Sequence, residues 1–488
     1  MPTSLPYEEP SLIRLLVFSS FLYLLNLARI AADFLLHGGI VAEIALGIIY
    51  GSPLAALLPI EWEETFTVLG YLGLILVVFQ GGLSSNLPML LSNLPLSTVC
   101  ALVGVGVPIA FSFALLNAAF GYKPLEAFAA GAALSSTSLG TTLAALNSQS
   151  RIGTVLISAA IIDDVVGLVI AAVIPALALV QFPTSQSGNS GLAWTIIRPL
   201  LSSVLIAAIA PLVARFILRP LFWYHGVGEL GWGSEKHADA VKLFLMVVTV
   251  SAMAAISYYT STSILYGAYI AGLILTYISQ PPSTPSRSTD DAERTDRERR
   301  HKQRTEDLSF EAASSRLVSP VQEHVLLPLF FASIGFAIPF LDLWKPKIIW
   351  RGIVYSILMC LAKLAVGLPI LSRSEPLHEP PPPIGDSKPE PRVSPSPSPP
   401  PPPTPPRILT STPAAVFMGV AMVARGEIGL LIAQLARSSP SSGSPGLLGE
   451  EPFLLCIWAI LVCTLVGPIS LGLIVRRWGA RVNAGVWA

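Results

Sequence analysis

Two adjacent acidic residues, Asp163 and Asp164, lie deep inside the apolar run 152–180. If that run is a helix in a bilayer, each ionised carboxylate at its centre costs several kcal/mol and persists only where something compensates it. Neighbouring residues on a helix point ~100° apart, so the two carboxylates cannot face the same spot. We therefore expect one of them to face an ion-binding site and the other to face a protein partner.

A basic residue that could compensate these acids lies in a second apolar run, 348–371. There Lys363 is too central to reach the membrane surface easily. One buried cation and two buried carboxylates leave a net charge of about −1 if all three are ionised. That charge suits one monovalent cation, or one proton in its place. A static salt bridge beside a permanently protonated acid is the alternative, and the residues alone leave it open.

Polar residues also interrupt two further apolar runs. Thr137 and Ser138 stand among small residues in the run 125–146, and Arg425 and Glu427 lie in the run 414–435. Residues two apart do not face each other on a regular helix, so the second pair needs a distorted helix or partners on other helices. Both runs are predicted to break near the membrane midplane, where free backbone groups can meet an ion.

Other chemistries find less support. The six histidines are scattered in or beside loops, so neither a metal site nor a cofactor is expected. A phosphate-binding loop is lacking from the sequence, which disfavours ATP-driven pumping. An intramembrane aspartyl protease needs its two aspartates on different helices, whereas these are adjacent. Asp33 and Asp239 lie near helix ends and are expected to be solvated.

The composition indicates a membrane protein. Of the 488 residues, 52% are hydrophobic and 12% are charged, whereas soluble domains carry about 25% charged residues, so lipid must cover the surface. The net charge of zero gives no sign of a nucleic-acid partner. A spanning helix needs roughly 20 mostly apolar residues, and about thirteen such runs occur. These runs are 11–34, 40–58, 65–82, 96–120, 125–146, 152–180, 196–218, 240–259, 261–278, 325–344, 348–371, 414–435 and 453–474.

The sequence thus predicts an all-α polytopic membrane protein of about thirteen transmembrane helices. Arginine and lysine concentrate after the seventh and ninth runs and in the C-terminal tail, which favours an outside N-terminus and a cytoplasmic C-terminus. Six helices, a linker helix and six more would form an inverted repeat, as in many secondary transporters. The kind of membrane, plasma or internal, stays open.

Five segments follow along the chain. The first, 11–278, holds the first transmembrane half, the linker helix and helices eight and nine. The second, 281–319, is predicted to be a disordered, charged cytoplasmic loop. Helices ten and eleven occupy 323–371, a proline-rich disordered loop occupies 374–406, and helices twelve and thirteen occupy 412–477.

Taken in order, these features resemble the monovalent cation:proton antiporter family, the sodium/proton exchangers. The similarity covers nearly the whole chain outside the two loops. It rests on Gly-Leu-Ile-Leu-Val-Val-Phe-Gln-Gly-Gly-Leu at 73–83, the stretch 135–142, the Asp163–Asp164 pair, Leu-Phe-Phe-Ala-Ser-Ile-Gly at 329–335, Lys363, and Arg-Gly-Glu-Ile-Gly at 425–429.

The resemblance implies a role for each of these residues. Asp164 matches the family's essential ion-binding carboxylate, and Asp163 matches the position before it. Lys363 matches the lysine that pairs with the first aspartate, while Thr137 and its neighbours match the broken helix beside the ion. Ser84 stands where relatives often have an acid, and Ala159 stands where animal exchangers have glutamate. The second of these departures favours the branch with paired aspartates.

The resemblance further implies an elevator-type transporter, with helices four to six and eleven to thirteen as the moving core and the others as a scaffold that dimerises. We therefore predict a transporter, not an enzyme, that exchanges a monovalent cation for protons across a bilayer, with sodium as the first candidate. A potassium/proton exchanger would use the same residues. An organic-solute transporter of similar topology is the more distant alternative.

Overall fold

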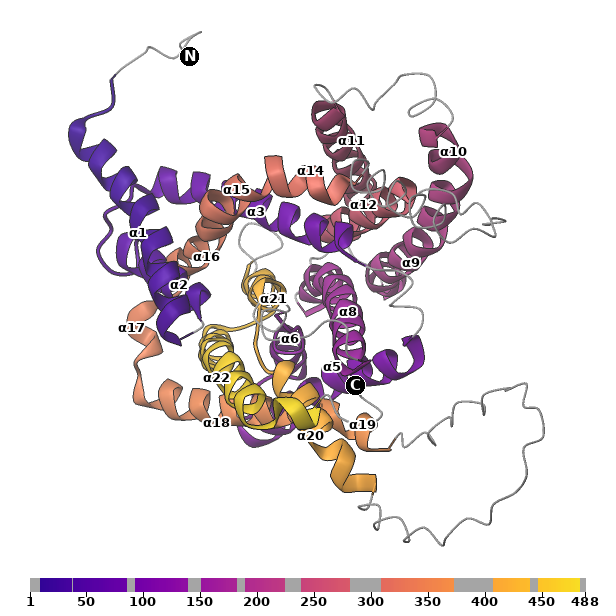
Figure 1. Ribbon diagram of the computed structural model, residues 1–488. Helices are drawn as coiled ribbons and strands as arrows, with labels where there is room; N and C mark the ends of the chain where they lie inside the picture. The colour runs from indigo at the N-terminus through magenta and orange to yellow at the C-terminus, as the bar shows by residue number, and fades with distance from the viewer. Residues whose placement is uncertain are drawn as a thin grey trace, which may run out of the picture.

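The computed structural model describes nine segments of the chain, all of them built from helices and the turns between them (Figure 1). The described segments are 9–36, 38–85, 93–138, 151–181, 189–223, 238–280, 309–372, 407–438 and 446–482.

The first part of the chain runs from α1 to α12. Its elements are α1 (Leu12–Leu36), α2 (Gly39–Tyr50), α3 (Ile60–Leu83), α5 (Leu94–Ser112), the π-helical turn η1 (Phe113–Ala119), α6 (Pro124–Ala133), α8 (Arg151–Gln181), α9 (Asn189–Val213), the π-helical turn η2 (Ala214–Leu218), α10 (Arg219–Leu221), α11 (Ala238–Tyr259) and α12 (Ile264–Ser279).

The second part runs from α14 to α22. Its elements are α14 (Phe310–Leu317), α15 (Ser319–Val321), the π-helical turn η4 (Gln322–Leu326), α16 (Leu327–Phe336), α17 (Phe340–Leu343), α18 (Pro346–Leu364), the 3₁₀ turn η5 (Ala365–Gly367), α19 (Leu368–Ser372), α20 (Arg407–Ala421), α21 (Glu427–Arg437) and α22 (Glu450–Val482).

Many of these helices are long and apolar enough to cross a membrane. Within the described segments there are eight, or nine if the bent pair Phe310–Leu317 and Ser319–Phe336 is one span. Three shorter apolar helices, Gly39–Tyr50, Ile264–Ser279 and Thr412–Ala421, overlap other predicted runs. The all-α membrane fold is confirmed, while the number thirteen and the inverted repeat stay predictions.

The helices gather into two groups. The scaffold consists of α1, α2, α3, α11, α12 and α16, in which α3 packs on both α12 and α16. Figure 1 shows α3 reaching from the side of α1 and α2 toward α12. The core bundle consists of α5, α6, α8, α18, α20, α21 and α22, which pack on one another below the scaffold in that view. The linker helix α9 contacts both α8 and α12.

Glycines set the spacing of the scaffold helices. At the crossing of α3 and α12, a Cβ on Gly272 would lie 2.7 Å from the backbone nitrogen of Leu83, and a Cβ on Gly82 would lie 3.1 Å from Gly272 Cα. Side chains cannot fit there, so the two backbones touch, which is the usual way that helices associate in lipid. The glycine-rich run 73–83 is therefore a packing surface.

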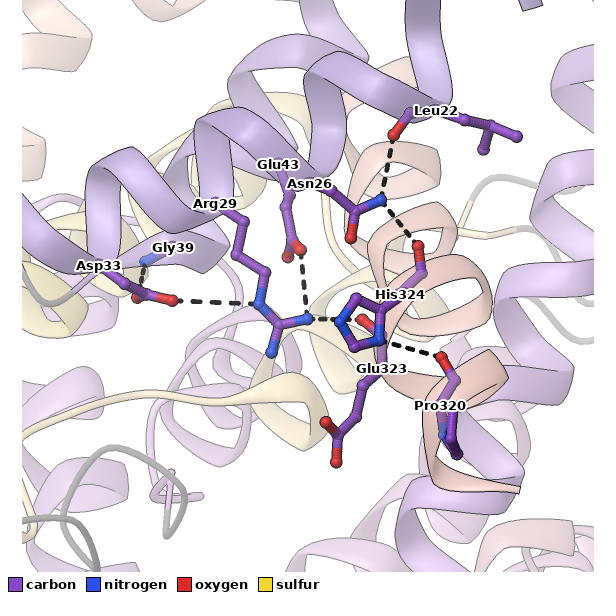
Figure 2. Close-up of polar contacts among 9 residues, drawn as sticks. All are labelled: Leu22, Asn26, Arg29, Asp33, Gly39, Glu43, Pro320, Glu323 and His324. Atoms are coloured by element: carbon purple, nitrogen blue, oxygen red, sulfur yellow. Dashed lines mark hydrogen bonds and ion pairs between the residues drawn. The ribbon is translucent and has the colours of Figure 1, made fainter. Parts of the chain in front are cut away.

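A polar cluster ties the N-terminal end of the scaffold together (Figure 2). Arg29 of α1 lies 3.7 Å from the buried Glu43 of α2 and donates to the Glu323 carbonyl oxygen at 2.7 Å. Asn26 donates to the carbonyl of His324 at 2.8 Å. Both acceptors belong to the π-helical turn η4, where the wider winding disturbs the regular backbone bonding. Side chains of α1 thereby use carbonyls of η4 as acceptors.

The prediction that 281–319 is a disordered loop is wrong at the C-terminal end of that segment. Residues 281–308 lie outside the described segments, but α14 begins at Phe310 and α15 at Ser319. The Ser309 side chain caps α14 by accepting from the Ala312 backbone, and Phe310 and Ala313 are buried in the main apolar cluster. Two buried side chains one turn apart hold this short helix in place. Its polar composition makes the segment resemble a loop in the sequence. The loop 374–406 lies outside the described segments.

The packing of α3 on α12 can be tested by adding one methyl group. Gly272→Ala must push Leu83 away, and overpacking of this kind costs about 1–3 kcal/mol. We expect a lower melting temperature for the purified protein in detergent. Gly81→Ala is the matched control, because nothing lies within 4 Å of a Cβ there. Equal melting temperatures for the two variants would contradict the proposed close contact.

Candidate functional site

Two interrupted helices meet in the middle of the core bundle. The helix α6 ends at Ala133 and is followed by the non-helical residues 134–138, while α20 ends at Ala421 and α21 begins at Glu427. The backbone N–H of Ser138 donates to the Ala424 carbonyl at 2.9 Å. A Cβ on Gly426 would lie 3.0 Å from Ser138 Cβ, so glycine permits this approach. The break between α20 and α21 and the end of α6 both fall inside the runs where the sequence predicts a break; residues 139–150 lie outside the described segments.

Asp163, Lys363 and Thr137 form a buried triad beside this crossing. Lys363 Nζ lies 3.2 Å from Asp163 Oδ2, and both side chains are fully buried. The Thr137 hydroxyl donates to the same Oδ2 at 2.7 Å and accepts from Lys363 Nζ at 2.9 Å. The ion pair is thus bridged by a hydroxyl that serves both partners. Three elements contribute to it: α8, α18 and the extended segment after α6.

Asp164 lies outside this triad and is half-buried. Its Oδ1 is shielded from solvent and finds no hydrogen-bond partner among the described residues. The carboxylate acts electrostatically on Asp163, Lys363 and Glu427. As the helical geometry requires, the two neighbouring aspartates have different surroundings: Asp163 is paired with Lys363, whereas Asp164 Oδ1 has no donor among the described residues.

Two further enclosed oxygens accompany Asp164. Asp163 Oδ1 and Ser136 Oγ are likewise shielded and without a hydrogen-bond partner in the described part of the chain. Ser136 lies close to α8, because a Cβ on Gly167 would be 3.6 Å from Ser136 Cβ. Oxygens without donors are suitable ligands for a dehydrated monovalent cation, and a proton on a carboxylate satisfies the same need. The sequence predicts Thr137 and Ser138 as ligands and misses Ser136.

Arg425 and Glu427 do not pair with each other. Arg425 is fully buried and donates to the Ser136 carbonyl oxygen at 3.3 Å, and its own carbonyl accepts from Thr464 at 3.1 Å. Glu427 is half-buried at the first position of α21, where the helix dipole favours a carboxylate. Arg425 therefore serves a backbone carbonyl of the non-helical segment after α6, a partner that the sequence could not specify.

The site offers charges and oxygens for a monovalent ion. Within the described segments, no three His, Cys, Asp or Glu side chains come together as a metal cluster would require. Asp163 is neutralised by Lys363, so Asp164 is the carboxylate whose charge is left for a cation or a proton. Such a site can hold either one, and their competition is the chemical basis of coupling.

Comparisons with known proteins agree with this arrangement. The family described as "Sodium/hydrogen exchanger, transmembrane" matches residues 17–477. The high-affinity Na⁺/H⁺ antiporter NhaS3 of Synechocystis sp. is 36% identical over 119 residues, which are 24% of this chain and 26% of that protein. The Na⁺/H⁺-K⁺ antiporter GerN of Bacillus cereus is 22% identical over 433 residues, or 88% of each chain.

A solved structure has the same fold. The sodium proton antiporter MjNhaP1 from Methanocaldococcus jannaschii, determined at pH 8, superposes with a TM-score of 0.59 at 14% identity. The superposition covers 96% of this chain and 99% of that one. Nearly every described helix therefore has a counterpart, whereas at this identity the likeness concerns the fold alone.

The bridging role of Thr137 predicts a stability effect. Thr137→Val keeps the side-chain shape but leaves Asp163 and Lys363 each short of one hydrogen bond. Hydrogen bonds to charged groups contribute about 1.5–3 kcal/mol, so the valine variant should melt at a lower temperature in detergent. Thr137→Ser keeps the hydroxyl and should stay near the wild type. If the two variants melt together, the hydroxyl does not hold the triad.

Proposed function

This chain belongs to the sodium/hydrogen exchanger family, and from that premise we propose that it exchanges a monovalent cation, sodium first, for protons across a membrane. The observation that carries the proposal is the asymmetry of the aspartate pair. Asp163 is held by Lys363 at 3.2 Å, whereas Asp164 Oδ1 is enclosed without a donor among the described residues. A buried carboxylate in that position must acquire a cation or a proton.

Competition at Asp164 would couple the two gradients. The carboxylate binds the cation when ionised and loses it when protonated, so each ion leaves before the other can bind. A difference of one pH unit across the membrane is worth about 1.4 kcal/mol per proton. That energy drives the cation the other way. Asp163 Oδ1 and Ser136 Oγ are further enclosed oxygens without a donor among the described residues, and in this proposal they contribute to the same site.

The pair of Asp163 and Lys363 gives the site a second proton-carrying group. When a cation occupies Asp164, it repels the ammonium of Lys363, which weakens the pair and favours release of a proton from the lysine. Two protons would then move for each cation, so each cycle carries one net charge. Membrane potential contributes ~2.3 kcal/mol per net charge per 100 mV, and exchange would respond to voltage as well as to pH.

An elevator movement would expose the site to each side in turn. In this proposal the core bundle slides against the scaffold, carrying both interrupted helices with it. Support comes from a cavity of about 410 Å³ between the two groups, which is lined by Tyr71 of α3, Ser333 of α16 and Leu431 of α21. Glu63 and Glu64 stand at one end of it, where they would attract cations. In a homodimer joined through the scaffold, the contacts between the two scaffolds would keep them fixed while the core bundles move.

The orientation follows from the positive-inside rule. An outside N-terminus places the acidic residues near Glu63 on the outer face and the basic ends of α10 and α22 in the cytoplasm. Potassium is the second candidate ion, because the relative of Bacillus cereus is named for both sodium and potassium.

Exchange should depend on the single carboxyl group of Asp164. We expect Asp164→Asn to abolish cation-dependent recovery of a pH gradient in proteoliposomes, measured by dye dequenching with lithium, sodium and potassium in turn. Asp239→Asn is the matched control, since Asp239 pairs with Arg316 at 2.8 Å near the start of α11. Proton-coupled cation flux in the Asp164 variant would refute the assignment, and a response to potassium alone would reverse the order of ions.

The lysine should determine the response to voltage. Lys363→Ala removes the second proton carrier, so exchange that survives should carry no net charge and lose its dependence on membrane potential. The measurement is the initial rate of exchange in vesicles held at a series of imposed potentials. A variant that transports with the voltage dependence of the wild type would show that the lysine carries no proton.

A further inference from the structure

A second, larger cavity lies beside the helix that carries the aspartates. Its volume is about 820 Å³, and its walls come from α8, from α9 with η2, and from α12. The wall on α8 includes Ile162 and Val165, and the wall on α12 runs from Tyr266 past Ile274. Helix α9 contributes Ala207 and Ala210, and η2 contributes Ala214; their short side chains leave the space open.

The cavity is apolar along its length and basic at one end. Along α12 it extends from Tyr266 to Gln280, the residue after the helix, over a separation of fourteen residues or about 21 Å at 1.5 Å per residue. That length exceeds the depth of one leaflet, which is half of a hydrocarbon core about 30 Å thick. Tyr277, Gln280 and Arg215 line the far end.

Arg219 strengthens the positive charge at that end. Its guanidinium donates to the Tyr277 hydroxyl at 3.4 Å and to the Gln280 carbonyl at 3.3 Å, and lies 5.2 Å from the centre of the Tyr277 ring. These contacts hold Arg219 in place, while the Arg215 side chain is exposed. Two arginines one turn apart therefore stand where the apolar cavity meets the membrane surface.

These features favour a lipid acyl chain over a hydrated cation as the occupant of the cavity. A hydrated cation would pass two like charges and then lose its water among aliphatic side chains, so the cavity is a poor entry path for the transported ion. An acyl chain fits apolar walls of this length, and a phosphate fits arginine. We propose that the cavity binds an acyl chain of an anionic phospholipid from the cytoplasmic leaflet, with the headgroup phosphate at Arg215 and Arg219.

The position of this lipid gives it a mechanical role. One wall of the cavity is α8, four of whose residues at 161–166 face the chain, and the opposite wall is the scaffold helix α12. A lipid between them contacts both the helix that carries Asp163 and Asp164 and the part proposed to stand still. The leaflet composition would thereby favour one relative position of the two groups.

Direct binding tests the proposal without relying on the proposed exchange. The protein is purified in detergent and mixed with phosphatidylglycerol or phosphatidylcholine of the same acyl chains, and bound lipid is measured by native mass spectrometry. We expect phosphatidylglycerol to bind more tightly. Arg215→Gln should weaken its binding about fivefold, since one basic residue near an anionic surface contributes about 1 kcal/mol, and should leave phosphatidylcholine unchanged.

Matched variants separate the headgroup contact from the cavity. Arg198→Gln changes an arginine at the other end of α9, which donates to the Tyr259 carbonyl at 2.9 Å, and should bind phosphatidylglycerol as the wild type does. Ala210→Trp fills the cavity and should reduce binding of both lipids severalfold. Ala208→Trp, on the exposed side of the same helix, should not. Ala207→Phe, at the exposed edge of the cavity, replaces Ala210→Trp if that variant does not fold.

Two results would overturn the proposal. Equal binding of the two lipids, or equal weakening by Arg215→Gln and Arg198→Gln, would remove the headgroup contact. Retention of phosphatidylglycerol by the cavity-filling variants at the level of Ala208→Trp would place the acyl chain elsewhere.

Discussion

The charge of Asp163 inside an apolar bundle is the constraint on which the rest of the structure depends. A carboxylate removed from water needs an opposite charge and hydrogen bonds in place of its water shell. Lys363 supplies the opposite charge at 3.2 Å, and Thr137 joins both groups through one hydroxyl. That hydroxyl is available only because α6 ends at Ala133 and lets the chain extend toward α8. The interruption of one helix is therefore a structural requirement of the charge on another.

Backbone carbonyls in the non-helical segments also need hydrogen-bond donors, and Arg425 supplies one. Ending α6 inside the bundle leaves carbonyl oxygens without their helical partners. Arg425, fully buried, donates to the Ser136 carbonyl in the non-helical segment after α6, and the Ser138 N–H donates to the Ala424 carbonyl between α20 and α21. Each non-helical segment thus supplies hydrogen-bond partners to the other. Buried charges here support an irregular backbone as much as they bind ions.

The sequence specifies the residues that must be compensated better than it specifies their partners. Asp163, Asp164 and Lys363 stand out because charge inside a long apolar run has few explanations, and the breaks follow from glycine and hydroxyl residues where a lipid-facing helix would have leucine. Ser136 as an enclosed oxygen, the carbonyl partner of Arg425, and the contact of Arg29 with Glu43 depend on distances between segments far apart in the chain. Periodicity carries no such information. The sequence does not reveal helix α14 for a related reason, since only two buried side chains give it a weak hydrophobic pattern.

The long sequence separation within the triad has a consequence for biogenesis. Lys363 follows Asp163 by 200 residues, and at about 5–20 residues per second a ribosome needs about 10–40 s to make that stretch. Throughout this interval the nascent α8 has its aspartates but not its lysine. Until then, protons, water or the insertion machinery must neutralise or solvate the aspartates of the newly made helix. The first half therefore inserts into the membrane without the ion pair that later holds α8. The site is complete only after α18 has been inserted, among the last steps of assembly.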